Sequence, residues 1–327
     1  MAEPGFSMAP LRPLGGTGLQ VSAIGLGMAA LGRPGYLTLG HESDLPANRD
    51  VRSMCGHAKT VLDAAWAGGV RYVDAARSYG RAEQFLASWL RSRGLRPTVG
   101  SKWGYRYTAD WQVDADVHEV KDHSLGHLDA QLAESREVLD GCLDLYQIHS
   151  ATLASGVLRD TRVLARLADL RATGVAIGLT TSGPEQARVI REAVETRLDG
   201  VRLFDTVQST WNLLEPSAGP ALAEAADRGV AVIIKEALAN GRLAGRDPHV
   251  NARLRADRGL GVDAVAIAAA LAQPWVTVVL SGAASADQLT SNLRALTPAA
   301  REAAAGVVTR PEPAQTYWAR RSTLPWT

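Results

Sequence analysis

Short apolar runs alternate along the chain with longer stretches in which apolar residues recur at helical spacing. Apolar runs of about four to eight residues predict buried strands, and apolar residues about every three or four positions predict amphipathic helices. The predicted strands are Val21–Gly27, Val70–Asp74, Val99–Lys102, Leu143–His149, Val175–Thr180, Asp205–Gln208, Ala231–Lys235 and Val276–Ser281. The predicted helices are Ala58–Ala67, Ala82–Ser92, Leu125–Leu139, Thr161–Ala172, Pro184–Thr196, Gly219–Arg228, Val262–Ala272 and Ala286–Leu296.

This alternation of strands and helices indicates an α/β fold with a parallel sheet. Most of the strands are continuous apolar runs, which is typical of strands buried on both faces. Eight uninterrupted strand–helix units favour a closed (β/α)8 TIM barrel over an open doubly wound sheet. Leu11–Leu14 and the Gly-Gly-Thr-Gly turn at 15–18 predict an N-terminal β-hairpin that caps the barrel. We therefore expect a single barrel domain over residues 1–327.

Two segments are longer than this rhythm requires. The first is a polar loop with glycine and proline from Ala29 to about Ser53, and the second is a C-terminal tail from about residue 310. Loops of this length in compact domains are often functional. For Tyr317 and Trp318 in the tail, two roles stay open: covering a substrate pocket, or packing against the outside of the barrel.

Composition narrows the class of partner. The chain of 327 residues is 46% hydrophobic and 21% charged, with a net charge of +1, so nothing indicates a nucleic-acid partner. The two cysteines, Cys55 and Cys142, do not make a disulfide framework. We see no signal-peptide pattern and no apolar run of membrane-spanning length. We therefore expect a cytoplasmic protein with a small-molecule substrate and no membrane partner, and we leave the oligomeric state open.

Ionisable residues gather where the predicted strands end. The second strand ends at Asp74, and Tyr79 lies in the loop that follows. The third, fourth and seventh strands end at Lys102, His149 and Lys235. Because barrel enzymes take their active residues from the carboxyl ends of the strands, these side chains are expected to converge at the mouth of the barrel.

The residue types suit proton transfer to a carbonyl oxygen. A phenol has an unperturbed pKa of about 10, and an adjacent ammonium group lowers it by stabilising phenolate. Asp74 would hold Lys102 charged beside Tyr79, and His149 could donate a hydrogen bond to the carbonyl oxygen. Each residue alone has a structural explanation: a buried ion pair, a loop aromatic, or a core histidine. Their joint placement at neighbouring strand ends favours an active site.

Four segments resemble motifs of the aldo-keto reductase family, in the family's order and over nearly the whole chain. They are LGGTGLQVSAIGLG (14–27), GVRYVDAARSYG (69–80) followed by Ala82 and Glu83, GSKWGY (100–105) and LDLYQIH (143–149). The resemblance implies hydride transfer between a nicotinamide cofactor and an aldehyde, ketone or sugar. It makes Tyr79 the general acid-base, Lys102 and Asp74 its tuning pair, and His149 the residue that orients the substrate.

The resemblance also implies an extended dinucleotide and no metal. Its implied cofactor contacts are Gly27, Met28, Asp74, Thr180, Thr181, Gln208, Lys235, Leu238, Ser281, Ala283, Gln288 and Asn292, and its implied substrate contacts are Ala29, Trp103 and Arg77. Residues 240–243 resemble the family's loop over the pyrophosphate. Arg77 could instead form a surface ion pair.

The sequence departs from the family pattern at several of these positions. Ala75 replaces a threonine, and Thr180 with Thr181 replaces a Ser-Asn pair. Lys235 replaces a stacking aromatic ring, so it would either meet a phosphate or pair with Glu236. Members that firmly prefer NADPH usually carry Arg or Lys within the stretch 281–291, and this chain has neither. NADP(H) is favoured on family grounds, and NAD(H) remains the alternative.

Two other patterns in the sequence partly match known binding motifs. The G-x-G-x-x-A pattern at 25–30 is not followed by a helix, so we do not expect a Rossmann fingerprint there. His118, Glu119 and His123 lack the four-residue spacing of a zinc helix, and a polar loop is expected instead. A cofactor-sensing regulatory subunit of the same fold, and an unrelated barrel lyase or isomerase, remain the alternative functions.

Overall fold

The computed structural model describes residues 10–247, 259–307 and 310–327, and its core is a closed barrel of eight parallel strands. Each strand pairs with the next along the chain, and the last pairs with the first. The strands are β3 (Ile24–Gly27), β4 (Tyr72–Asp74), β5 (Thr98–Trp103), β8 (Leu145–Ala151), β9 (Ala176–Thr181), β12 (Thr206–Thr210), β13 (Ala231–Lys235) and β14 (Val278–Ser281). The predicted (β/α)8 barrel is confirmed.

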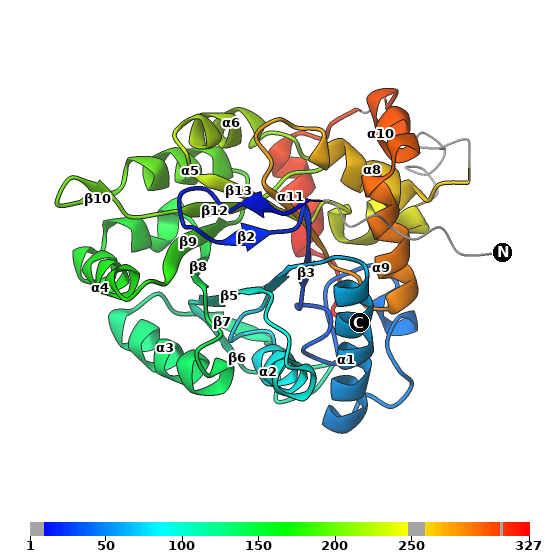
Figure 1. Ribbon diagram of the computed structural model, residues 1–327, viewed down its shortest axis with the longest axis horizontal. Coiled ribbons are helices and arrows are strands. Elements are labelled where there is room, and N and C mark those ends of the chain that lie inside the picture. The colour runs from blue at the N-terminus through cyan, green and yellow to red at the C-terminus, as the bar shows by residue number, and fades with distance from the viewer. Residues whose placement is uncertain (1–9, 248–258, 308–309) are drawn as a thin grey trace.

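Helices lie around the strands, as Figure 1 shows. The eight that alternate with the strands are α1 (Val51–Ala67), α2 (Ala82–Arg93), α3 (Leu125–Leu139), α4 (Thr161–Ala172), α5 (Gln186–Glu195), α6 (Gly219–Asp227), α8 (Val262–Leu271) and α9 (Ala286–Leu293). Most are amphipathic and bury one apolar face. The exception is α8, whose residues 264–270 are all buried and apolar, and α10 (Pro298–Ala305) packs over it.

The predicted hairpin closes the amino-terminal end of the barrel. Its strands are β1 (Arg12–Pro13) and β2 (Gln20–Val21), and its Leu14 and Val21 are fully buried against residues such as Ile233. The sequence predicted one strand from Val21 to Gly27, but the structure divides it. The buried Ser22 hydroxyl donates to the Ile24 carbonyl and accepts from the Arg71 backbone amide, where the chain turns from the hairpin into β3.

Three further elements differ from the prediction. Helix α1 begins at Val51 rather than Ala58, because Asp50 caps it by accepting a hydrogen bond from the Ser53 amide. The expected polar loop before α3 contains an antiparallel hairpin, β6 (Tyr105–Tyr107) with β7 (Glu119–Lys121). The tail contains a helix, α11 (Ala314–Ser322), whose Tyr317 and Trp318 pack against the loops after β12 and β13.

The remaining elements are short. They are the two-stranded ladder β10 (Arg197–Leu198) with β11 (Val201–Arg202), the 3-10 turns η1 (His41–Ser43), η2 (Leu153–Ser155), η3 (Val157–Arg159), η4 (Ala239–Gly241) and η6 (Arg294–Leu296), and the π-helical turn η5 (Arg242–Arg246).

Candidate active site

A cavity of about 580 Å³ opens at the carboxyl end of the barrel. Side chains from the ends of six strands and from the loops that follow line it. The predicted site residues on its wall are Gly27, Ala29, Asp74, Tyr79, His149, Gln208, Lys235, Leu238, Ser281, Ala283, Gln288 and Asn292. The topology therefore brings most of the predicted site together in one place.

Lys102 and Asp74 form a buried ion pair beneath this cavity. The Lys102 ammonium donates to an Asp74 carboxylate oxygen and to the Ala75 carbonyl, at 2.9 Å in the second case. The Lys102 side chain is fully buried, and the Asp74 side chain is nearly so. A charge is retained at such depth only when a partner and hydrogen bonds compensate it. The pair thus holds a fixed positive charge at the floor of the cavity.

Tyr79 and His149 stand above this pair. The Lys102 Nζ atom lies 4.7 Å from the centroid of the Tyr79 ring. The Tyr79 hydroxyl and His149 Nε2 are 3.4 Å apart, while His149 Nδ1 lies 3.4 Å from the Ser78 hydroxyl. The two rings meet edge to face, with centroids 5.4 Å apart. Two proton-bearing groups therefore face one point on the cavity wall, next to a buried cation.

Burial dominates the protonation of both groups. It raises the pKa of the Tyr79 phenol well above its usual range, and the nearby Asp74 carboxylate raises it further, whereas Arg33 lowers it. Burial and the Lys102 charge hold the pKa of His149 well below its usual range. At neutral pH the phenol therefore carries its proton, and the imidazole is uncharged.

Asp74 is the centre of a hydrogen-bond network that the sequence only partly predicted. Its second oxygen accepts from the Tyr72 hydroxyl at 3.0 Å, from Gln147 at 2.9 Å and from Gln208 at 3.2 Å. Gln147 was not predicted, although it lies two residues before His149, and alternate residues of a strand share a face. This network fixes the carboxylate that in turn fixes Lys102.

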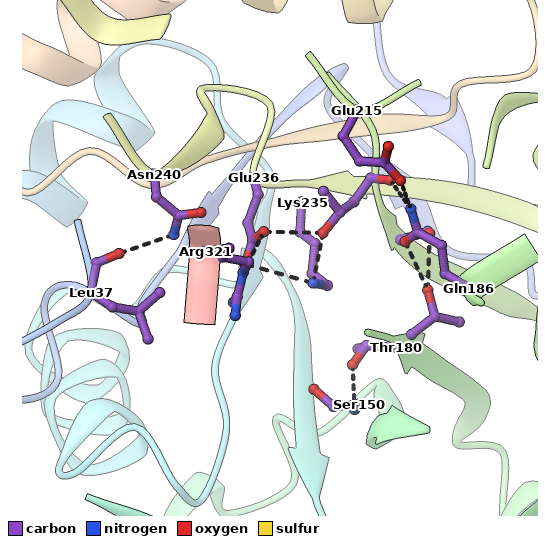
Figure 2. A network of polar contacts seen from close by, with 12 residues as sticks. Leu37, Ser150, Thr180, Gln186, Glu215, Lys235, Glu236, Asn240 and Arg321 are labelled. Atoms are coloured by element: carbon purple, nitrogen blue, oxygen red, sulfur yellow. Dashed lines mark hydrogen bonds and ion pairs between the residues drawn. The ribbon is translucent and has the colours of Figure 1, made fainter. Parts of the chain in front are cut away.

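Lys235 lies in a second charged cluster on the cavity wall, which Figure 2 shows. Its ammonium donates to the Thr210 hydroxyl at 2.9 Å and lies 3.8 Å from the Glu236 carboxylate. Arg321, from α11, makes the closer ion pair with Glu236. Burial lowers the pKa of Lys235 to about 8. Burial alone would raise the pKa of Glu236, but the Arg321 and Lys235 charges lower it to about 2.

Two loops meet across the cavity. The side-chain amide of Asn240 donates to the Leu37 backbone carbonyl at 3.0 Å, a contact visible in Figure 2. The backbone carbonyl of Asn240 accepts from the Leu39 backbone amide. Arg246 pairs with Asp44. The segment 240–243, which resembles the family's pyrophosphate loop, is thus joined to the first long loop by the hydrogen bonds of Asn240, and Arg246 just beyond it adds an ion pair.

The α9 side of the cavity carries a different set of groups. Its residues come from α8 and α9 and are Asp263, Asp287, Gln288, Ser291 and Asn292. The Gln288 side chain accepts from the Ala284 amide, which shapes the turn before α9. The side-chain oxygen of Asn292, Oδ1, is buried with no hydrogen-bond partner among the described residues. Because a buried polar atom without a partner is costly, this oxygen suits a ligand that brings a donor.

Several predicted contacts lie away from the cavity wall. Trp103 is fully buried among the core side chains, because it follows Lys102 on β5 and so faces the opposite side of the sheet. Arg77 forms ion pairs with the buried Glu83 and the exposed Glu134, so the ion pair that was expected at the surface extends into the core. Neither side chain lines the cavity.

Three predicted cofactor residues also lie behind the wall. Met28 is fully buried in the core. Thr180 accepts a hydrogen bond from the Ser150 amide at 2.7 Å (Figure 2), and Thr181 donates to the Ser209 hydroxyl. Both threonines are fully buried, and the next residue, Ser182, lines the cavity. Their hydroxyls are thus already engaged by the protein.

The described residues supply no sign of a metal centre or of a membrane span. Among them, no group of three or more His, Cys, Asp or Glu side chains is arranged to hold a metal ion. No helix of the described chain has the length and apolar character needed to cross a membrane.

The comparisons with known proteins agree with this geometry. Pyridoxal 4-dehydrogenase from Microbacterium luteolum is 28% identical over 265 residues, which cover 71% of this chain and 72% of that protein. D-threo-aldose 1-dehydrogenase from a Pseudomonas species is 26% identical over 214 residues, covering 60% of this chain and 64% of that protein. The chain thus spans less than two thirds of the second relative.

Solved structures share the fold. An aldo-keto reductase from Bacillus halodurans, in its holo form, superposes with a TM-score of 0.67 at 20% identity and 95% coverage of both chains. A glycerol dehydrogenase from Gluconobacter oxydans has a TM-score of 0.67 at 21% identity, covering 92% of this chain and 97% of its own. Residues 23–304 match the profile of the Aldo/keto reductase family. The chain belongs to the aldo/keto reductase family.

Proposed function

We propose that this protein is an NAD(P)H-dependent oxidoreductase that interconverts an aldehyde, ketone or sugar carbonyl and the corresponding alcohol. The observation that carries the proposal is the buried Lys102 ammonium, held by Asp74 and lying 4.7 Å from the Tyr79 ring centroid on the cavity floor. The relatives named as dehydrogenases of pyridoxal and of an aldose support the same reaction type.

The residues have distinct roles in this reaction. When bound, the nicotinamide supplies or accepts the hydride. In reduction, Tyr79 gives its hydroxyl proton to the forming alkoxide oxygen, and Lys102 stabilises the phenolate left behind. Asp74 keeps Lys102 charged and in place. His149, uncharged at neutral pH, donates a hydrogen bond that orients the substrate oxygen beside Tyr79. In oxidation, the same proton moves in the opposite direction.

The cavity wall fits an extended dinucleotide. Gln208, on the inner face of β12, would bind the carboxamide. Leu238 and Ala283, on the loops after β13 and β14, would flank the pyrophosphate, and the amide groups at the start of α9 suit its charge. The unpartnered carbonyl oxygen of Asn292 would accept from the amino group of the adenine. Lys235 would meet a phosphate, since an ammonium cannot stack on a ring as an aromatic residue does.

The charges on the α9 side favour NAD(H). Two carboxylates, Asp263 and Asp287, line this part of the cavity, and neither α8 nor α9 contains a lysine or arginine. The extra phosphate of NADP(H) would add negative charge beside them without a cation from either helix. We therefore propose NAD(H) as the preferred cofactor, instead of the NADP(H) that family resemblance favoured.

The test follows nicotinamide absorbance with purified protein, NADH or NADPH, and a panel of aldehydes, ketones and aldoses. We expect turnover with at least one carbonyl and a higher kcat/KM for NADH than for NADPH. Cofactor binding without turnover across the panel would support the regulatory, cofactor-sensing alternative. Absence of any cofactor binding, measured by fluorescence quenching, would contradict both and support a barrel lyase or isomerase.

A further inference from the structure

Arg33, in the first long loop, is a buried cation beside Tyr79. Its side chain is only 2% exposed, although arginine is rarely buried unless it is paired. The guanidinium carbon lies 5.2 Å from the centroid of the Tyr79 ring, close to the 4.7 Å that separates the ring centroid from Lys102 Nζ. The phenol therefore has two cations within reach, and they come from different parts of the chain.

Two glycines bring the loop that carries Arg33 against the turn that carries Tyr79. The Gly32 carbonyl accepts from the Arg81 amide at 2.7 Å. A Cβ atom on Gly32 would lie 2.2 Å from the Tyr79 carbonyl oxygen, and one on Gly80 would lie 2.5 Å from the Gly32 carbonyl oxygen. Only glycine permits backbones this close. The position of Arg33 relative to the phenol is thus built into the backbone.

The contacts of Arg33 hold its charge in place. One terminal nitrogen donates to Glu119 at 2.6 Å and to the Ser78 carbonyl at 3.1 Å. The guanidinium also lies over the rings of Tyr36 and Trp326, at 5.0 and 4.6 Å. The Nε atom is buried and has no hydrogen-bond partner among the described residues. Among the described residues, Glu119 is the one carboxylate that pairs with Arg33, and the guanidinium also lies against aromatic rings.

We propose that Arg33 is a positioning residue that, together with Lys102, stabilises the phenolate of Tyr79 during proton transfer. When the O–H bond of Tyr79 breaks, the proton goes to the alkoxide oxygen and the negative charge stays on the phenolate. Two buried cations then face that charge. Glu119 opposes the effect, because its carboxylate pairs with Arg33 and its negative charge repels the phenolate.

The electrostatic surroundings of Tyr79 agree with these signs. Burial is the largest influence and raises the pKa of Tyr79; Arg33 lowers it, and Glu119 raises it. The charged and titratable groups that face Tyr79 from the packed elements are Asp74, Lys102, His149, Arg33, Glu119, Glu236, Tyr36 and Tyr72. Of these, Arg33 and Glu119 form an ion pair whose members act on the phenol with opposite signs, so neutralising each in turn gives opposite effects.

The inference rests on the proposed reaction, and its test is a pair of variants. The pH dependence of kcat/KM for alcohol oxidation reports the pKa of the group that accepts the proton. In Arg33→Met we expect this pKa to rise by about one pH unit, since one of two cations near the phenol is lost. In Glu119→Gln we expect it to fall. Arg33→Lys should lie between wild type and Arg33→Met.

The controls separate the role of Arg33 from the proposed reaction itself. Wild-type turnover tests the proposed reaction, whereas the directions of the pKa shifts in Arg33→Met and Glu119→Gln test the role of Arg33. Arg71→Met, which removes another guanidinium that lies over a ring, at the opposite end of β4, should leave the pKa unchanged. If Arg33→Met fails to fold, as judged by thermal unfolding, a fall in Glu119→Gln still supports the inference. An unmoved pKa in Glu119→Gln, or shifts of the same sign in both variants, would overturn it.

Discussion

The side of the cavity around Tyr79, which is the proposed catalytic side, pairs cations with carboxylates, whereas the α9 side carries carboxylates with no cation from α8 or α9. On the Tyr79 side, Lys102 pairs with Asp74, and Arg33 pairs with Glu119. Arg321 and Lys235 both pair with Glu236. Around Asn292, the charged groups from α8 and α9 are the carboxylates Asp263 and Asp287. Under the proposed function, the difference gives each side its own task. The fixed cations would stabilise a phenolate and the substrate oxygen, whereas the amides and carboxylates would select between the dinucleotides.

The largest expected effect comes from removing the cation shared by Asp74 and Tyr79. Lys102→Met should lower turnover by about 10²- to 10⁴-fold, since the phenolate loses its nearest cation. It also leaves the buried Asp74 carboxylate unpaired, which costs about 3–5 kcal/mol of folding free energy. Steady-state kinetics and urea unfolding measure the two effects.

The matched control for this variant is Lys121→Met, which removes a lysine that donates to the Ser150 carbonyl on β8. We expect turnover within a few-fold of wild type. Similar losses in the two lysine variants would break the assignment of the catalytic side to Lys102.

Glu236 tests whether the second cluster on the catalytic side is structural. Glu236→Gln leaves Arg321 and Lys235 without their carboxylate, so the free energy of unfolding should fall by about 3–5 kcal/mol at pH 7. Because the folded-state pKa of Glu236 is lowered to about 2, its stabilisation is present above the ordinary glutamate range and is lost as pH falls toward 2. Urea unfolding from pH 7 to pH 2 should therefore show the wild type and the variant converging in acid.

Glu224→Gln is the control for that experiment, because Glu224 forms an ion pair with Arg191 on the exposed surface. Its unfolding should be close to wild type at every pH, since exposed ion pairs contribute little. A Glu236→Gln protein as stable as wild type at pH 7 would show that α11 does not depend on this pair.

A change on the α9 side should alter cofactor choice without altering chemistry. In Asp287→Asn, the loss of one carboxylate should raise kcat/KM for NADPH about 3- to 10-fold relative to NADH, which is about 1 kcal/mol. Asp227→Asn, at the exposed end of α6, is the control and should leave the ratio unchanged. An unchanged ratio in Asp287→Asn would remove this carboxylate from cofactor selection.

The smallest effect is expected at Lys235. Its pKa is lowered to about 8, so it is charged below that pH and neutral above it. If it meets a phosphate, cofactor affinity should weaken a few-fold as pH rises through about 8, and Lys235→Met should show no such dependence. Fluorescence titrations of NADH at about pH 6.5, 8 and 9.5 measure the affinity below, near and above the lowered pKa of Lys235. A parallel pH dependence in wild type and variant would contradict the phosphate contact.

The sequence predicted the catalytic side better than the rest because strands fix where their last residues point. Asp74 ends β4, and Lys102 and His149 lie within two residues of the ends of β5 and β8. The barrel alone therefore brings the three side chains together. Trp103 shows the limit of that argument. Side chains alternate along β5, so Trp103 points away from Lys102 and is buried in the core, a placement that the position at a strand end alone does not predict.

Residues outside the strands could not be placed in this way. Arg33 lies in a loop whose path depends on the close contact between Gly32 and Gly80, which are far apart in sequence. Glu236 follows β13 with a positive φ of 54°, a conformation that a glutamate pattern does not predict. Arg321 reaches the cavity only because α11 packs against the loops after β12 and β13.

The central claim is that Tyr79 moves the proton in a hydride-transfer reaction, and one paired measurement tests it most directly. Tyr105 lines the same cavity, with its ring centroid 5.0 Å from that of His149, so Tyr105→Phe is the matched control for Tyr79→Phe. We predict that Tyr79→Phe lowers kcat by about 10²-fold or more while NADH binding is retained, and that Tyr105→Phe stays within about tenfold of wild type. Near-normal turnover in Tyr79→Phe would contradict the account.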